Sequence, residues 1–343
     1  MRINCDHINR RIIKRKKLGS LSKMKVIALL LALVAVASCN LFVSVSPARN
    51  GAVTFSITNE GVEPAEFLTY GTPFDGETLF FPILNITTRD GLHVPYNGPR
   101  ARFVYPPPKT ATVNLPAGST LSALLRVSEY YELPTEGDYA VSITLPRFNP
   151  TLAEARINEE PTTARLVPGT GRKQGSRADF TNCSGTKQDQ IIAAANTGLT
   201  QSRNAYNCLN GRTCNDLNTR WFGTSVGSAN YNYDIDTFSK VNTYLQNGIN
   251  AYCDPAGCGP NVYGYVYPTD STKTVYLCGA FWSVPNERAN TIVHEESHFN
   301  NGVSLKGTDD YTYGEVSCLA LAKSSPADAS HNADNVCFMS AEA

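Results

Sequence analysis

Between residues 41 and 150, short stretches in which hydrophobic and polar residues alternate predict β-strands. Val53, Phe55 and Ile57 alternate with small polar residues, and the same pattern recurs from Tyr139 to Leu145. Clusters of Gly, Pro and Asn separate these stretches, as turns do. Short alternating strands spaced by turns predict an N-terminal antiparallel β-sandwich. This part of the sequence contains no recognisable nucleophile, metal-ligand cluster or phosphate-binding loop.

The periodicity changes in the second half of the chain. Residues 190–206 are rich in alanine, and a third helix is expected to include residues 290–299. Residues 262–267 and 274–277 are rich in β-prone side chains and predict two short strands. A further apolar stripe recurs at spacings of three and four and so predicts one face of a helix: Ile235, Phe238, Val241, Leu245 and Ile249. This half is therefore predicted to be α+β and mostly helical.

The chain is thus expected to be multidomain. Residues 151–178 are polar, end in a Gly-rich basic stretch, and predict a linker, either cut or left intact. The predicted layout is a leader over 1–39, a β-sandwich domain over 40–150 that is either a removable segment or an accessory module, this linker, and a C-terminal domain over 179–343.

The leader consists of a basic stretch followed by twelve apolar residues, 26–37. Because a membrane-spanning helix needs roughly 20 such residues, the pattern predicts a secretory signal rather than an anchor. The run Val36-Ala37-Ser38-Cys39 resembles the lipobox of bacterial lipoproteins. Two interpretations stay open, free secretion and a lipid on Cys39 that would hold the protein at the cell surface. That lipid would be the only membrane contact.

Charge and cysteine usage agree with export. The whole chain has 30 basic and 30 acidic side chains, but residues 1–38 hold nine of the bases and one acid, so the remainder has 21 bases and 29 acids, a net charge of −8. This acidity disfavours nucleic acid as a partner. Eight of the ten cysteines lie beyond residue 180. An even number in an exported chain predicts a disulfide framework of up to four bridges, whose pairing stays open.

The predicted third helix carries a pattern of metal ligands, H-E-x-x-H. His294 and His298 lie four residues apart and therefore on one face of the helix. Both imidazoles can then reach one zinc ion, and Glu295 beside them can deprotonate a water that zinc activates. A catalytic zinc also needs a third protein ligand, for which a carboxylate within 307–314 is the best candidate. Gly302 and Gly307 are expected to let the chain turn back to the helix.

These residues resemble a known family. H-E-x-x-H followed closely by Gly307-Thr308-Asp309-Asp310-Tyr311-Thr312-Tyr313-Gly314 is similar to the signature of the aspzincin metallopeptidases, the deuterolysin and peptidyl-Lys metalloendopeptidase family. The likeness extends to residues 274–282 and 332–335 and covers roughly 180–339. It implies a zincin-type metallopeptidase domain that acts on polypeptides, with Zn²⁺ as cofactor, and we expect a monomer.

The resemblance also implies roles for individual residues. His294, His298 and Asp310 would bind zinc, Glu295 would be the general base, and Tyr313 would donate its hydroxyl to the oxyanion of the tetrahedral intermediate. A positioned donor at that point is worth a few kcal/mol in such reactions. Two weaker candidates for the third ligand are kept open, Glu315 and His331, and Asp309 is expected to face solvent.

A preference for lysine on the carboxyl side of the cleaved bond is a further implication of the peptidyl-Lys branch. Asp334 matches one of the carboxylates that receive the lysine there, whereas Cys337 stands at the position of the other. With one carboxylate missing, discrimination is expected to be weaker. Residues 274–278, which include Tyr276, would be the edge strand that aligns the substrate through main-chain hydrogen bonds.

A second hypothesis belongs to a different class. The protein could be a non-catalytic surface binding protein in which zinc only braces the helix. A structural zinc site needs neither Glu295 nor Tyr313, so their presence favours an exported zinc endopeptidase.

Overall fold

The computed structural model describes residues 40–76, 78–169, 180–300 and 306–343. The predicted leader, including Cys39, lies outside the described residues, as do Gly302 and most of the basic end of the predicted linker. Among the helices that are described, none is both long and apolar enough to cross a membrane.

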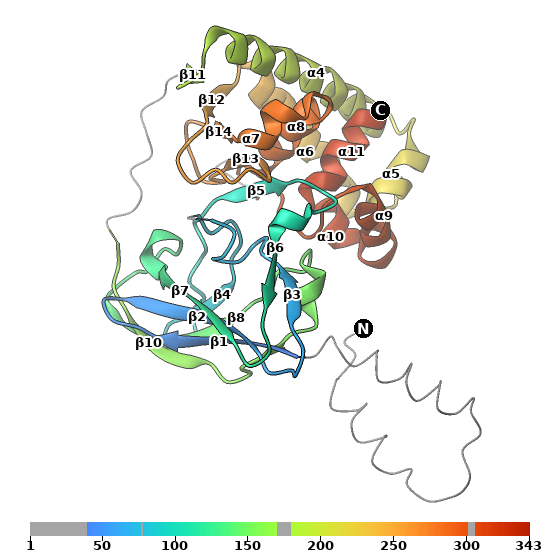
Figure 1. The fold of residues 1–343 in the computed structure, drawn as a ribbon. Helices are drawn as coiled ribbons and strands as arrows, with labels where there is room; N and C mark the ends of the chain where they lie inside the picture. Colours follow the sequence, from blue (N-terminus) through green and yellow to red (C-terminus); the bar gives the residue numbers. More distant parts are fainter. Residues whose placement is uncertain (1–39, 77, 170–179, 301–305) are drawn as a thin grey trace, which may run out of the picture.

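The first half is built from mostly antiparallel sheets, in which β9 is the one described strand that pairs parallel with its neighbour, β1 (Figure 1). One sheet has the order β7-β2-β1-β9, a second has the order β10-β8-β4, and β3 and β6 form a two-stranded ribbon. Alternate side chains of β1 and β2 are buried, and they share a hydrophobic core with β4, β8 and β10. The strands are β1 (Leu41–Pro47), β2 (Ala52–Asn59), β3 (Ala65–Leu68), β4 (Leu84–Thr87), β6 (Thr112–Leu115), β7 (Thr120–Arg126), β8 (Gly137–Ile143), β9 (Arg156–Ile157) and β10 (Thr162–Leu166).

The predicted linker begins too early in the sequence. Residues 156–157 form β9 beside β1, and residues 162–166 form β10, which pairs along its whole length with β8. Ala164 and Leu166 on β10 are buried in the core of the first half, whereas their neighbours are exposed. This strand has only two apolar residues, so the polar composition of the segment resembles that of a linker.

The second half contains a sheet with the order β11-β12-β14-β13-β5. Its strands are β11 (Phe180–Thr181), β12 (Asn250–Cys253), β13 (Val262–Val266), β14 (Thr274–Leu277) and β5 (Arg100–Phe103). Strand β5 comes from the first half of the chain and pairs antiparallel with β13. The prediction that 274–278 is the edge strand is wrong, because β14 lies between β12 and β13 and Tyr276 pairs with Tyr252 on one side and Tyr265 on the other.

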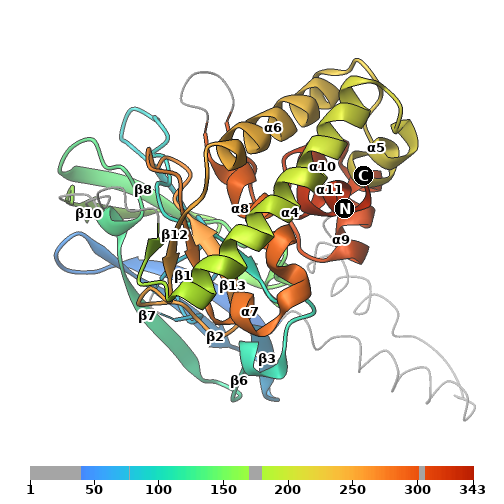
Figure 2. The same cartoon turned by 90° about the horizontal axis from the view of Figure 1, so that it is seen from above.

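Helices of the second half surround α8, which carries the H-E-x-x-H pattern. Helix α8 packs against α4, α6, α7, α11 and the strands β5, β13 and β14 (Figure 2). Every side chain from Thr291 to His298 is buried. The remaining helices are α3 (Pro150–Ala153), α4 (Gly185–Asn210), α5 (Asn215–Phe222), α6 (Ala229–Gln246), α7 (Gly279–Ser283), α8 (Arg288–His298), α9 (Glu315–Ser324), α10 (Pro326–Ser330) and α11 (Ala333–Glu342), with 3-10 turns at η2 (Lys109–Ala111), η3 (Val127–Glu129) and η4 (Pro285–Glu287).

Three disulfides brace the second half, in line with the predicted framework. They join Cys183 to Cys253, Cys208 to Cys214 and Cys258 to Cys278. Cys318 and Cys337 are buried free thiols, so the fourth bridge of the largest predicted framework is not formed. The first bridge ties the end of β11 to β12 and so fixes the start of α4 against the sheet.

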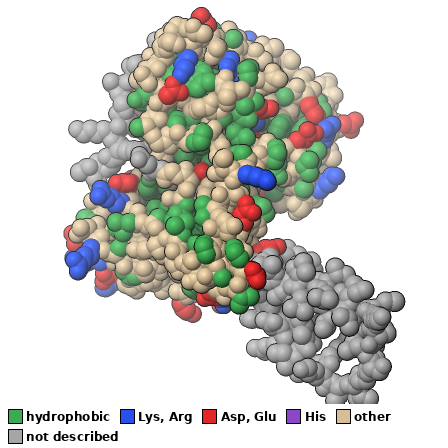
Figure 3. Space-filling view, in the orientation of Figure 1, with side chains coloured by type: hydrophobic (Ala, Val, Ile, Leu, Met, Phe, Trp, Pro, Cys, Tyr) green, Lys and Arg blue, Asp and Glu red, His purple; other side chains and the backbone are tan. Residues whose placement is uncertain are grey.

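The two halves meet through a third hydrophobic core. It contains Phe103 on β5, Tyr70 and Phe148 from the first half, and Tyr265 and Tyr313 from the second. The rings of Tyr70 and Phe103 are stacked with centroids 4.3 Å apart, and the Phe148 and Tyr313 rings meet edge to face at 4.9 Å. In the space-filling view the surface narrows where the halves meet, and hydrophobic side chains lie on both sides of this waist (Figure 3). Strand β5 therefore reaches the second half as part of a packed interface.

Candidate active site

The two histidines of α8 present one nitrogen each to the same point. Their Nε2 atoms lie 3.1 Å apart, and both side chains are fully buried. His294 donates its Nδ1 hydrogen to Asp334 at 2.9 Å, and His298 donates its Nδ1 hydrogen to the carbonyl of Thr308, also at 2.9 Å. A neutral imidazole carries one hydrogen, so these bonds leave a lone pair on each Nε2. Two lone pairs that face each other at this distance can bind one cation between them.

Asp310 is the carboxylate that faces the same point. Its Oδ1 lies 3.2 Å from Nε2 of His294, and its Oδ2 lies 3.5 Å from Nε2 of His298. Both oxygens are buried, and neither accepts a hydrogen bond of ordinary geometry from the described residues. A buried carboxylate without donors is costly unless a positive charge compensates it. The residues present therefore fit a zinc ion with two imidazole ligands and one carboxylate ligand.

A second group of potential ligands lies on the other side of His294, formed with Asp334 and Cys337. The guanidinium of Arg102 is 3.0 Å from the same Asp334 oxygen that His294 contacts. A resident positive charge disfavours a second cation at that place. Asp334 therefore orients His294 and does not bind a metal ion itself. A carboxylate behind a metal-binding imidazole usually has this role.

Glu295 lies beside the imidazoles and is also fully buried. Burial raises the pKa of its carboxyl group to about 8. One oxygen, Oε1, accepts the main-chain N–H of Arg102 at 3.3 Å, and the other has no hydrogen-bond partner among the described residues. A cation held by the neighbouring imidazoles would lower this pKa again. One oxygen of Glu295 and one nitrogen of each imidazole lie within 4.8 Å of one another, so Glu295 can act as a base there.

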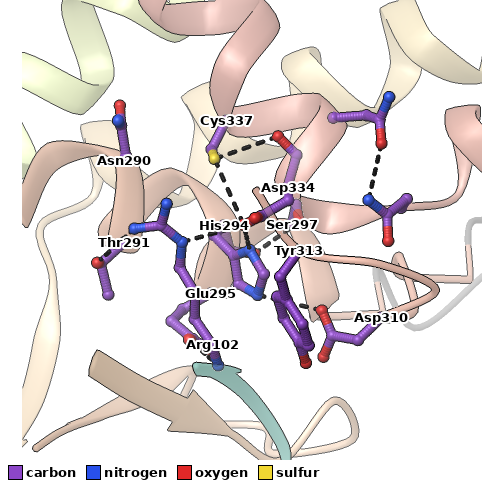
Figure 4. A network of polar contacts seen from close by, with 12 residues as sticks. Arg102, Asn290, Thr291, His294, Glu295, Ser297, Asp310, Tyr313, Asp334 and Cys337 are labelled. Atoms are coloured by element: carbon purple, nitrogen blue, oxygen red, sulfur yellow. Dashed lines mark hydrogen bonds and ion pairs between the residues drawn. The ribbon is translucent and has the colours of Figure 1, made fainter. Parts of the chain in front are cut away.

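Tyr313 lies on the opposite side of His294 from Asp334, with its ring facing the imidazole (Figure 4). Its hydroxyl donates to the main-chain carbonyl of Ala101 at 2.7 Å. Burial and the nearby carboxylate of Asp310 raise the pKa of this phenol well above its ordinary value, so the hydroxyl keeps its hydrogen. Tyr313 is therefore a donor aimed at a peptide carbonyl beside the candidate metal site.

The loop that carries Asp310 and Tyr313 is fixed from α11 and its N-terminal flank. The side chain of Asn332 accepts the main-chain N–H groups of Tyr311 and Thr312 at 2.7 and 3.1 Å. Gly307 brings the chain back to α8 as expected. Glycine is needed there because the backbone passes close to the end of α8, and not because its conformation is left-handed. A Cβ atom there would lie 1.8 Å from the carbonyl oxygen of His298.

The weaker candidates for the third ligand lie elsewhere. Glu315 is exposed and is 3.4 Å from Arg220, while His331 packs on the ring of Tyr233. The expectation that Asp309 faces solvent is wrong, because its carboxylate accepts two hydrogen bonds from Arg100 at 2.6 and 3.1 Å.

The carboxylate of Asp334 is not open to solvent in this structure. It is 2% exposed, and besides His294 and Arg102 it accepts the main-chain N–H of Gly314 at 2.8 Å. Burial opposes its ionisation, but Arg102 and His294 outweigh burial and hold its pKa well below the ordinary value. Tyr276 is in the interior of the sheet, where its ring stacks on Tyr265 at 4.8 Å.

Sequence reasoning missed two residues of this site, Arg102 and Glu287. Arg102 is 4% exposed and bonds to Asp334, to Thr291 Oγ1 at 3.0 Å and to Glu287 Oε2 at 3.0 Å. The run Arg100-Ala101-Arg102-Phe103 looks like any short strand, and nothing local shows that it pairs with a strand 160 residues later. The one sequence signal for this contact was the predicted preference of the site for a lysine side chain, because a site that binds lysine can also bind the arginine of its own chain.

Comparison with known proteins supports a metallopeptidase site. The family described as "Lysine-specific metallo-endopeptidase" matches residues 192–339. Over 166 residues the chain is 40% identical to the peptidyl-Lys metalloendopeptidase of Pleurotus ostreatus, covering 46% of this chain and 93% of that protein. It is 28% identical to an extracellular protease of Aeromonas hydrophila over 308 residues, 82% of this chain and 85% of that protein.

Among solved structures, a zinc peptidase from Grifola frondosa is 32% identical and aligns with 46% of this chain and 96% of its own, with a TM-score of 0.42. The Pleurotus relative, 40% identical and matched over 93% of its own length, shows the family. The chain belongs to the aspzincin metallopeptidases and is a zinc metalloendopeptidase.

Proposed function

We propose that His294, His298 and Asp310 hold the catalytic zinc ion, that Glu295 is the general base, and that Tyr313 binds the oxyanion. The observation that carries this assignment is the convergence of two imidazole lone pairs, 3.1 Å apart, with a buried carboxylate that lacks hydrogen-bond donors. When bound, zinc supplies Lewis acidity, which lowers the pKa of a water molecule and polarises the scissile carbonyl.

The protein's own groups then move the protons. Glu295 removes a proton from the attacking water and later gives it to the leaving amine, for which its position beside a peptide N–H is suitable. Tyr313 donates a hydrogen bond to the carbonyl oxygen as negative charge develops on it. Asp334 keeps the imidazole of His294 in the tautomer whose Nε2 can bind the metal.

We also propose that the enzyme prefers a basic residue on the carboxyl side of the cleaved bond. Asp334 and Glu287 together hold a guanidinium in this structure, and Thr291 accepts a further hydrogen bond from it. Glu287, just before α8, thus supplies a second carboxylate although Cys337 stands at the position expected for one. Two carboxylates around one cation favour Lys and Arg over neutral side chains.

We also propose a domain organisation and a location for the protein. Two mostly antiparallel sheets that share one core support a β-sandwich module from residue 40 to about 166, followed by the peptidase domain over 179–343. The substrates are polypeptides, and the protein acts as an exported monomer. Residues 1–39 are its leader, and it is either secreted freely or held at the cell surface by a lipid on Cys39.

The purified chain is expected to contain one zinc ion, and a chelator should abolish its cleavage of casein. Because zinc binds only the folded protein, its removal should also lower the melting temperature by roughly 10 °C where free zinc had been about 1,000 times its dissociation constant. Elemental analysis, a casein assay and calorimetry measure the three quantities, and added zinc should restore them. Full cleavage by metal-free protein would refute the assignment.

The bonds that the enzyme cuts in denatured casein should mostly precede Lys or Arg. Glu287 and Asp334 offer charge to either side chain, so neither should dominate completely. Mass spectrometry of the peptides gives the cleaved positions directly and does not depend on the rate. Cuts spread evenly over neutral residues would contradict the proposed pocket and leave the zinc site untouched.

A further inference from the structure

One face of α6 carries polar side chains that contact the backbone around the candidate zinc site. Tyr233, Lys240 and Tyr244 follow one another at spacings of seven and four residues, which places them on one polar stripe of the helix. This polar stripe is separate from the apolar stripe that includes Phe238 and Val241. Helix α6 packs beside α8 (Figure 2), so the polar stripe can reach the end of the helix that carries both histidines.

The two tyrosines hold the backbone where it leaves α8 and where it returns. The hydroxyl of Tyr244 donates to the carbonyl of Asn300 at 3.1 Å, and the hydroxyl of Tyr233 donates to the carbonyl of Lys306 at 2.9 Å. The side chain of Asn300 in turn accepts the main-chain N–H of Gly307 at 2.8 Å. One helix therefore fixes both ends of the connection between the zinc-binding helix and the segment that carries the third proposed ligand.

Lys240 lies between these two contacts on the polar stripe and reaches the carbonyl of Ser297. Its Nζ donates to that oxygen at 2.8 Å, and the main-chain N–H of Thr308 donates to the same oxygen at 3.0 Å. The carbonyl of Thr308 accepts the Nδ1 hydrogen of His298 at 2.9 Å, and Asp310 follows two residues later. Lys240 therefore contacts a backbone oxygen at which the segment with the carboxylate ligand docks on the helix with the imidazole ligands.

Packing alone does not explain a lysine at this position. Lys240 is 6% exposed, and burial together with the nearby Lys273 lowers the pKa of its ammonium group to about 7. An apolar side chain of similar length would fill the space without that desolvation cost. The carboxylate of Glu296 compensates the charge, and a donor at the C-terminal end of α8 complements the last carbonyls of the helix. The amine is therefore best explained by the carbonyl that it holds.

We propose that the polar stripe of α6, and Lys240 above all, positions the ligands of the zinc site. By holding the carbonyl of Ser297 in place for Thr308, Lys240 sets the position of Asp310 relative to the imidazoles. The inference rests on the proposed function, since it takes the two histidines and Asp310 as the ligands. The competing interpretation is that the polar stripe only stabilises the packing of α6 on α8.

The zinc affinity of full-length Lys240→Met tests the proposal. Methionine fills a similar volume without a donor, so the ligands should remain but be held less precisely. Loss of a group that orients metal ligands costs roughly 10- to 100-fold in affinity, so the zinc dissociation constant should rise about tenfold in competition with a chromogenic chelator. Cobalt(II) bound in place of zinc should also show a changed visible absorption spectrum, because that spectrum depends on the geometry of the ligands.

Val241→Ala is the matched structural control. Val241 is the next residue along α6 and is fully buried on the apolar stripe. Its truncation should lower the melting temperature, as loss of buried methyl groups does, but leave the zinc dissociation constant and the cobalt spectrum as in the wild type. A role in packing alone would make the two variants behave alike.

Two further variants keep the test decisive if Lys240→Met does not fold. Lys240→Met combined with Glu296→Gln removes both buried charges, and its zinc affinity should be as low as that of the single variant. Tyr233→Phe keeps the ring and loses only the hydroxyl that contacts Lys306, so its zinc dissociation constant should rise a few-fold.

The outcomes separate the inference from its foundation. If the folded Lys240 variants bind zinc as tightly as the wild type and give the same cobalt spectrum, the polar stripe only packs the helices and the inference is overturned, while the proposed function stands. An equal loss of zinc affinity in Val241→Ala would overturn it as well, because the effect would then follow stability. If the wild-type chain takes up no zinc, or if His298→Ala leaves zinc affinity unchanged, the proposed function fails and the inference fails with it.

Discussion

Glu295→Gln is expected to lower kcat by about three orders of magnitude while the protein keeps one zinc ion. General base catalysis contributes roughly 10²- to 10⁴-fold, and an amide can neither take a proton from water nor return it to the leaving amine. The amide oxygen can still accept the N–H of Arg102, so the local structure should persist. Steady-state kinetics and elemental analysis of the wild-type and variant proteins measure the effect.

Glu296→Gln is the matched control, because it makes the same change one residue further along α8. Glu296 is also buried, but its charge faces Lys240 and Lys273 rather than the imidazoles. Its substitution should leave kcat within a few-fold of wild type. Equal losses in the two variants would mean that helix packing, and not base catalysis, explains the effect.

Asp310→Asn is expected to weaken zinc binding by more than about 100-fold and to abolish cleavage at low free zinc. Loss of a partner behind a metal ligand already costs 10- to 100-fold in affinity, and Asp310 is proposed to contact the metal itself. The variant also removes the negative charge that compensates the cation in a buried site. Competition with a chromogenic zinc chelator gives the dissociation constant directly.

Asp309→Asn provides the comparison at the adjacent position. Its carboxylate faces Arg100 and Lys306, so its loss should leave zinc affinity unchanged while it weakens the contact between Asp309 and Arg100 on β5. If Asp309→Asn lost zinc and Asp310→Asn kept it, the assignment of the third ligand would be reversed.

Sequence reasoning succeeded where the determinants are local. The spacing of His294 and His298 places both on one face of a helix, and α8 forms over 288–298, close to the expected 290–299. The apolar stripe lies on α6 from Ile235 to Leu245 for the same reason, whereas Ile249, predicted to continue it, lies beyond the end of the helix at Gln246. The resemblance to the family pointed to Asp310, which the structure brings to the two imidazoles through a return of the chain.

Long-range arrangements could not be predicted in this way. Strand order depends on which strands find each other in space, so β14 turned out to be interior and β13 to be the neighbour of β5. Thr163 and Arg165 face solvent on β10, and a polar strand of five residues has too weak a pattern to separate from a linker. The partner of Asp334 was missed because Arg102 precedes it by 232 residues.

The three disulfides all lie between residues 183 and 278, and within the described ranges none bridges the two halves. A break in the backbone after Leu166 and before Phe180 would thus leave two pieces joined by non-covalent contacts alone. Their cohesion would become a bimolecular equilibrium, tight in a crowded, confined volume and lost on dilution. The volume into which the molecule is released would then determine what fraction of the two pieces remains associated.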